Sequence, residues 1–245
     1  MRSVQSILVT LFSILALISC KKDSSHAPHH CRIVAVYDTI YTSTGNGTSA
    51  TGISYDNDGR IAYENFREAT DSSIRIFVYH DSTILVTSTS PRQPTADTVH
   101  LNSKGNPIMI NFGERGYSLI EYTSYSYDGT GLLTSSTSGH NNSKTTTTYT
   151  YDNGDCVKTT SSNGEVINYT YFTDLTTRDG DPLAFQDIFG HGVPTIKNKH
   201  LVRSYQFGNF YAQYSYTFDN SGKIETVVYR CDTYVAARRY EYDCE

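Results

Sequence analysis

The side chains that could do acid–base or ligand chemistry gather in residues 174–200, DLTTRDGDPLAFQDIFGHGVPTIKNKH. Asp179 and Asp181 lie two residues apart, and His191 and His200 follow in the same stretch. Carboxylates and imidazoles that converge in a cleft can act as general acid and base, or can hold a polar ligand. This segment is therefore the first candidate for a functional site.

The same segment predicts one short helix. Asp181 is a good N-cap, Pro182 suits the first helical position, and Gly190 is a C-terminal stop. Residues 183–189 between them would make about two helical turns. The apolar side chains of these turns are Leu183, Phe185, Ile188 and Phe189.

Two interpretations of residues 174–200 remain open. In the first, the segment is a plug or lid that packs Phe185 and Phe189 over one open end of a sheet. In the second, it is a ligand loop, because long structured insertions on rigid scaffolds often carry function. The polar groups of such a loop would be Asp179, Asp181, His191 and His200.

Other patterns that could carry chemistry are weaker. The stretch HAPHHC, residues 26–31, offers imidazole and thiolate ligands for a transition metal, but it lies in a polar tether. The stretch DNDG at residues 56–59 begins like a calcium loop, yet Arg60 and Ile61 follow in place of further ligands. The sequence has no Gly-rich phosphate loop, no HExxH and no GxSxG. We therefore expect no metal, no cofactor and no enzymatic activity.

The composition indicates a β protein that would have to position these groups. The 245 residues include 21 Tyr and no Trp, and charged residues make up only 18%. Aromatic and β-branched residues fit a pleated, half-buried surface, whereas a helical chain would carry more Ala, Leu and Glu. The net charge of −5 gives no basis for binding nucleic acid.

A repeated hairpin pattern punctuates the chain. An aromatic residue ends a strand, Asp or Asn can accept from a backbone N–H two residues on, and Gly supplies a positive φ. An apolar residue then opens the next strand, which predicts a type I turn with a Gly bulge. The copies are SYDNDGRI (54–61), SYDGTGLL (126–133), TYDNGDCV (150–157) and TFDNSGKI (217–224), with HLNSKGNPI (100–108) a weaker one. TYDNGDCV is one residue shorter before its Gly and predicts a tighter turn.

If these turns share one end of the molecule, other turns must lie at the opposite end. Candidates for the opposite end include GNGTSATG (45–52), EATDSS (68–73), SNGE (162–165) and FGN (207–209). The count predicts about sixteen antiparallel strands in an up-and-down meander, a single all-β domain over residues 31–245 with one short helix in an insertion. So many strands curl, split or close, which leaves a rolled sheet and a closed barrel as alternatives.

The first residues predict an exported, lipid-anchored protein. Residues 1–19 have one early cation and a short apolar run, as in a secretory signal peptide. The run ends in Leu17-Ile18-Ser19-Cys20, which resembles the bacterial lipobox and would make Cys20 the lipidated residue. Residues 20–30 then read as a flexible tether. We expect a cell outer-membrane lipoprotein on either the periplasmic or the surface face.

The lipobox, the Tyr-Asp turns and the strand-rich remainder together resemble a family of Bacteroidota lipoproteins. The domain of that family has been described as porin-like and has no known function. The resemblance covers most of residues 31–245 and implies a porin-like barrel without implying an activity. A membrane-spanning barrel is disfavoured, because the strand KTTTTYTYD (144–152) has no apolar stripe to face lipid.

Four cysteines remain after Cys20 in an oxidising compartment. We favour a disulfide between Cys31 and Cys244, which would join the first strand to the last. The alternative is Cys156 with Cys244. A bridge from Cys231 would contradict the meander, because Cys231 precedes a turn at the opposite end.

Three functions remain in view. The first is a non-catalytic binding or structural module of the envelope, whose tyrosines could stack on a glycan or grip an envelope protein. The second is a glycan or peptide hydrolase with its site in residues 174–200. The third is a pore-associated or transport accessory protein, which would need an open lumen.

Overall fold

The computed structural model describes residues 31–89, 95–113, 120–140 and 143–244. The signal peptide, Cys20 and the tether with its histidines lie outside the described residues. The side chains of Phe185 and Phe189, which were expected to cap the sheet, also lie outside the description, although their backbone is helical.

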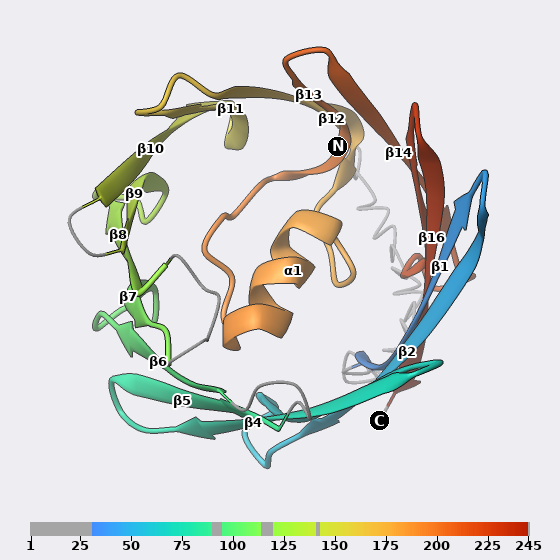
Figure 1. The fold of residues 1–245 in the computed structure, drawn as a ribbon, viewed down its shortest axis with the longest axis horizontal. Helices are drawn as coiled ribbons and strands as arrows, with labels where there is room; N and C mark the ends of the chain where they lie inside the picture. Colours follow the sequence, from blue (N-terminus) through green and yellow to red (C-terminus); the bar gives the residue numbers. More distant parts are fainter. Residues whose placement is uncertain (1–30, 90–94, 114–119, 141–142, 245) are drawn as a thin grey trace, which may run out of the picture.

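The described chain forms a closed barrel of sixteen antiparallel strands (Figure 1). Each strand pairs with the next, and the last returns to the first. The predicted all-β meander is confirmed, and of its two alternatives the closed barrel is the one that forms. The strands are β1 Cys31–Thr42, β2 Gly45–Tyr55, β3 Ile61–Glu68, β4 Asp71–Tyr79, β5 Thr83–Ser88, β6 Thr95–Leu101, β7 Pro107–Asn111, β8 Tyr122–Tyr127, β9 Leu133–His140, β10 Ser143–Asp152, β11 Asp155–Ser161, β12 Val166–Thr176, β13 His200–Phe207, β14 Phe210–Phe218, β15 Ile224–Cys231 and β16 Tyr234–Cys244.

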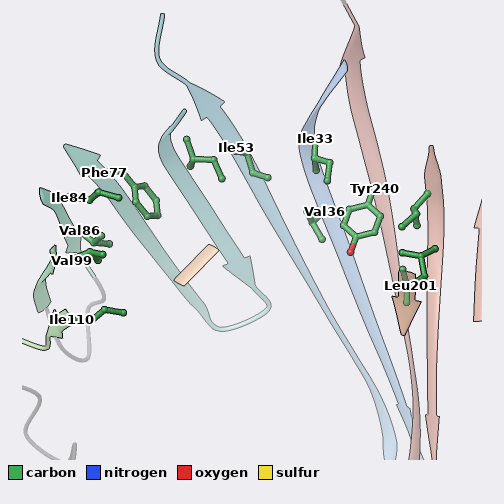
Figure 2. Close-up of a cluster of buried hydrophobic side chains, with 13 residues drawn as sticks. Ile33, Val36, Ile53, Phe77, Ile84, Val86, Val99, Ile110, Leu201 and Tyr240 are labelled. Atoms are coloured by element: carbon green, nitrogen blue, oxygen red, sulfur yellow. The ribbon is translucent and has the colours of Figure 1, made fainter. Parts of the chain in front are cut away.

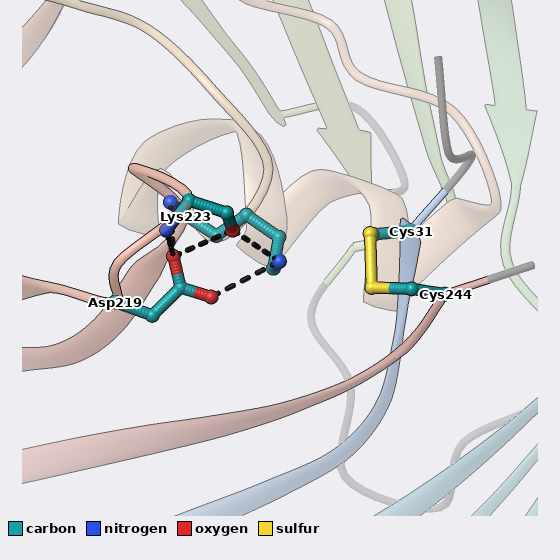
Figure 3. The surroundings of a disulfide bond; sticks show 5 residues. Cys31, Asp219, Lys223 and Cys244 are labelled. Carbon is teal, nitrogen blue, oxygen red and sulfur yellow. Dashed lines mark hydrogen bonds and ion pairs between the residues drawn. A yellow bond between two sulfur atoms is a disulfide. The ribbon is translucent and has the colours of Figure 1, made fainter. Parts of the chain in front are cut away.

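The barrel closes along a long seam between β1 and β16. The register runs from Cys31 opposite Cys244 to Thr42 opposite Tyr234, with one irregularity after Ile33. A disulfide joins Cys31 to Cys244 at the start of this seam (Figure 3). Among the described residues, the remaining cysteines are free thiols: Cys156 is buried and Cys231 is half-buried.

The Tyr-Asp turns have the chemistry that their sequence predicts. In the β14–β15 turn, Oδ1 of Asp219 accepts from the backbone N–H groups of Ser221 and Lys223, at 2.9 Å each. Gly222 lies at φ +81° and donates to the carbonyl of Asp219. The same pattern recurs at Asp56, Asn102 and Asp128.

Two turn assignments need correction or refinement. The tighter turn of TYDNGDCV forms as expected, with Asn153 at φ 51° and Gly154 at φ 90° between paired Asp152 and Asp155. By contrast, residues 45–52, expected as a turn, belong to strand β2 and pair with β1 from Gly45 opposite Thr42. The backbone ladder of the seam strand outweighs the low strand propensity of these glycines.

Most of the buried apolar side chains point into the barrel. Ile84, Val86, Val99 and Ile110 form one row across β5–β7 (Figure 2). Ile33, Val36 and Tyr240 lie on the opposite side, near the seam. Apolar burial is therefore spread around the inner wall, and the insertion between β12 and β13 packs against it through Ile188 and Val193.

That insertion carries helix α1, Pro182–His191, which crosses the ring of strands (Figure 1). Oδ1 of Asp181 accepts from the backbone N–H groups of Leu183 and Ala184, as an N-cap should. The helix ends later than expected, because Gly192 at φ 81°, and not Gly190, takes the left-handed cap. Gly190 is an interior residue of the helix.

The outer face of the barrel carries many polar side chains. Thr148 and Thr150 on β10 are exposed, whereas Tyr149 and Tyr151 on the same strand alternate to the other face and are half-buried. On β14 the exposed side chains include Gln213, Ser215 and Thr217. No helix within the described ranges is long and apolar enough to cross a membrane.

Candidate functional site

Two cavities within the described part of the barrel border the plug. Here the plug means residues 177–199, the insertion that includes α1. The larger cavity has a volume of about 740 Å³ and is bounded by α1 and by strands β1–β4 and β13–β16. The smaller, of about 480 Å³, lies near the rim that carries the Tyr-Asp turns.

One wall of the larger cavity is aromatic. Tyr205, Tyr214, Tyr229 and Tyr234 come from the four consecutive strands β13–β16, with neighbouring ring centroids 5.2 to 6.3 Å apart. The hydroxyls of Tyr205 and Tyr229 lie 2.8 Å apart. Burial raises the pKa of Tyr214, and likewise that of Tyr229, so these hydroxyls remain protonated at neutral pH. The wall therefore offers flat rings edged with hydrogen-bonding groups.

Another part of the cavity wall, which begins on the same strand β16, is charged and is built from two cross-strand ion pairs. Asp38 on β1 lies directly opposite Arg238 on β16, and two bonds of 2.6 and 3.0 Å join the carboxylate to the guanidinium. Glu64 on β3 lies opposite Arg75 on β4, with Oε2 at 2.9 Å from Nη1. Paired register, with alternate residues facing inward, places all four groups on the cavity side.

Glu64 is the most unusual of these groups. The residue is only 3% exposed. Burial raises the pKa of its carboxyl to about 7, although the nearby Arg75 acts in the opposite direction. Its second oxygen, Oε1, has no hydrogen-bond partner among the described residues. A buried polar atom left without a partner is costly, so the cavity contains an acceptor that a ligand could satisfy.

Helix α1 closes the cavity on its inner side with Pro182, Leu183 and Gly190. The site is thus apolar and aromatic on one part of its wall, charged on another, and fixed by β strands and a capped helix. Such a concave site, with few polar groups in fixed places, suits the binding of a small molecule.

The smaller cavity has a different character. Three arginines line it, and each guanidinium stacks over an aromatic ring that ends a strand at that rim. Arg32 lies over Tyr55, Arg60 over Tyr79 and Arg178 over Phe218. Two of them are also engaged by hydrogen bonds: Arg60 binds Asp56 and Asp58, and Arg178 binds the carbonyls of Thr176 and Gly222.

The site residues expected in 174–200 do not converge. Asp181 is 2% exposed, and its carboxylate is occupied by the N-cap of α1. His191 lies in the last turn of that helix, about 15 Å away along the helix axis. His200 pairs with Asp155, Nδ1 to Oδ2 at 2.7 Å, which ties the end of the plug to β11. Asp179 is exposed beside the smaller cavity, where its carbonyl accepts from the hydroxyl of Tyr242.

The residues of the larger cavity were not singled out from the sequence. Asp38 and Arg238 are separated by 200 positions, and only the closed seam brings them together. A weaker signal was present in β3 and β4, where Glu64 and Arg75 interrupt apolar stretches. Within the described ranges, no group of three or more His, Cys, Asp and Glu side chains could hold a metal ion.

Comparison with known proteins gives a fold and no family. No protein-family model matches the chain, and no curated protein matches it. Among solved structures, a porin-like protein from Bacteroides uniformis matches with a TM-score of 0.66 and 13% identity, over 86% of this chain and 98% of that one. A porin-like protein from Bacteroides vulgatus matches over the same shares with a TM-score of 0.56 and 13% identity. The chain therefore has the fold of these porin-like proteins.

Proposed function

We propose that this chain is a non-catalytic binding protein of the bacterial envelope, tethered through a lipidated Cys20, that holds a small ligand inside its barrel. The observation that carries the proposal is the larger cavity, whose lining combines a cluster of tyrosines with two cross-strand ion pairs. The cavity volume of about 740 Å³ lies within the range of known ligand sites.

The envelope location is supported by two observations. Residues 1–20 resemble a signal peptide that ends in a lipobox. The structures with the same fold are porin-like proteins of Bacteroides. The exposed threonines on β10 and polar side chains on β14 favour a barrel that stands in water on its tether over one that spans the bilayer.

The other two functions have less support. A hydrolase in residues 174–200 would need its carboxylate and base to meet, yet Asp181 and His191 occupy opposite ends of α1. A pore would need a continuous lumen, and the plug lies across it (Figure 1).

The test places a bulky side chain in the cavity and compares it with the same side chain on the outer face of the barrel. Ala236 lines the cavity, while Ala237 alternates to the outer face of the same strand. The chain 31–245 and its Ala236→Trp and Ala237→Trp variants are each dialysed against a small-molecule extract of bacterial envelopes, and the retained compounds are identified by mass spectrometry. We expect a compound retained by the wild-type protein and by Ala237→Trp, and lost from folded Ala236→Trp. Retention of no compound by the wild-type chain, or equal retention by both variants, would overturn the proposal.

A further inference from the structure

The larger cavity contains a hydrogen-bond acceptor without a donor. Oε2 of Glu64 takes a hydrogen bond from Arg75, while Oε1 has no partner among the described residues. Because Glu64 is almost completely buried, bulk water does not take the place of that partner. A ligand that fits the cavity is therefore expected to bring a hydrogen-bond donor to this point.

The charges of the cavity indicate that this donor is neutral. Asp38 is matched by Arg238, and above the raised pKa of about 7 the carboxylate of Glu64 matches Arg75, so the four charges then cancel. A cation or an anion brought into this site would lose its hydration without gaining an uncompensated opposite charge. A hydroxyl group gives up much less hydration and can fill the vacant position on Glu64.

The aromatic wall adds a requirement of shape. The ring centroids of Tyr214 and Tyr229 lie 5.2 Å apart. Together with Tyr205 and Tyr234, these two residues present adjoining ring faces and edges to the cavity. A ligand with one flat C–H face and a rim of hydroxyls would contact these rings and reach the charged wall at the same time. A pyranose ring has this division, with C–H groups on its faces and hydroxyls at its edge.

We propose that the larger cavity binds a neutral saccharide unit, with a ring face against one tyrosine ring of the aromatic wall and one hydroxyl donating to the carboxylate of Glu64. Arg75 is then a positioning residue, because its bond to Oε2 fixes the carboxylate of Glu64 at the cavity wall. This inference rests on the proposed function and names the ligand class of the same site.

The experiment is isothermal titration calorimetry on the chain 31–245. The probes are lactose, cellobiose and N,N′-diacetylchitobiose as neutral saccharides, glucuronic acid as an anion, glucosamine as a cation and the uncharged dye N-phenyl-1-naphthylamine as an apolar ligand. The variants are Glu64→Leu, which removes the acceptor, and Glu64→Gln, which keeps the shape but presents a mixed donor and acceptor. Glu241→Leu is the matched control, because Glu241 is exposed on β16.

We expect at least one neutral saccharide to bind, with affinity reduced about 10-fold or more in Glu64→Leu, less in Glu64→Gln and not at all in Glu241→Leu. If Glu64→Leu does not fold, the Glu64→Gln variant decides. Unchanged saccharide affinity in the folded Glu64 variants would remove Glu64 from the site. Binding of only the charged or apolar probes would overturn the saccharide class and leave the proposed function standing. Binding of no probe, together with no compound retained from the envelope extract, would overturn both.

Discussion

Two buried carboxyl groups in this barrel have different surroundings and different roles. Oδ1 of Asp181 accepts from two backbone N–H groups of the helix that it caps, and Oδ2 accepts from the hydroxyl of Thr177. Glu64 has one oxygen engaged by Arg75 and one without a partner. Asp181 is thus satisfied within the fold, whereas Glu64 is left incomplete at a cavity wall.

The pKa of Glu64 predicts how stability depends on pH. Its carboxyl moves from an ordinary value of 4.5 to about 7, so the folded chain holds this proton more tightly than the unfolded chain does. The contribution of Glu64 to stability is therefore present at low pH and lost as pH rises through this interval. Between pH 5 and pH 8 we expect Glu64→Gln to gain roughly 2–3 kcal/mol relative to the wild-type protein. Urea unfolding of both proteins at the two pH values measures this difference.

Glu241→Gln is the matched control for that measurement. Glu241 is exposed and hydrogen-bonded by Arg239, which lowers the pKa of its carboxyl. It is therefore ionised in both folded and unfolded chains above pH 5, and its replacement should leave the pH dependence unchanged. A Glu64→Gln variant that follows the wild-type pH profile would show that the Glu64 carboxyl has an ordinary pKa.

At the scale of one element, the start of α1 depends on Asp181. Replacing Asp181 by Ala removes the acceptor for the N–H groups of Leu183 and Ala184, and we expect a loss of about 1–2 kcal/mol in the free energy of unfolding. Asp181→Asn keeps an accepting oxygen, so we expect it to lower the free energy of unfolding by only about 0.3 kcal/mol. Chemical denaturation of the three proteins measures it, and equal losses in both variants would contradict a capping role.

Two glycines, one in a turn and one inside a helix, should respond to alanine with opposite signs. Gly105 lies in the β6–β7 turn at φ +77°, and Gly190 lies inside α1; an added Cβ meets no atom within 4 Å at either position. Gly105→Ala should cost about 1–2 kcal/mol through backbone strain. Gly190→Ala should stabilise the helix by about 0.5–1 kcal/mol. Thermal unfolding of the two variants provides the comparison, and a loss at both positions would show that packing outweighs backbone conformation.

Local signals made the elements predictable to different degrees. The Asp and Gly residues of the Tyr-Asp turns act within five positions of each other, so the hairpins could be identified from the sequence alone. The end of α1 was misplaced by two residues, because Gly190 and Gly192 both fit a stop and only the backbone conformation distinguishes them. The larger cavity could not be predicted, since its ion pairs depend on strand register and, at Asp38 and Arg238, on closure of the seam.

At the scale of the whole molecule, the sequence pattern could not distinguish a rolled sheet from a closed barrel. Alternation within a strand says which residues share a face, but it does not say whether the first strand meets the last. In the structure the two meet over eleven residue pairs of the β1–β16 ladder. The ladder extends from the disulfide at one rim to the Thr42–Tyr234 pair at the other.

The thiols of the whole chain give a direct test of this closure. In the folded chain 31–245, one cysteine should react with a maleimide, because Cys231 is partly exposed and Cys156 is buried. Two should react after unfolding without reductant, and four after reduction. Reduction should also lower the free energy of unfolding by about 2–5 kcal/mol, since the bond closes almost the entire chain. Mass spectrometry counts the labels, and four labels without reductant would contradict the disulfide.

The β1–β16 seam also means that the barrel can close only late in synthesis of the chain. The first strand has no partner on one side until the last strand has been synthesised, and the paired cysteines are 213 positions apart. Pairing across such a separation is slow to nucleate, and until it happens the growing sheet presents two open edges that can recruit other chains. The newly made chain is therefore most open to pairing with its own copies in the interval before β16, Tyr234–Cys244, is available to β1.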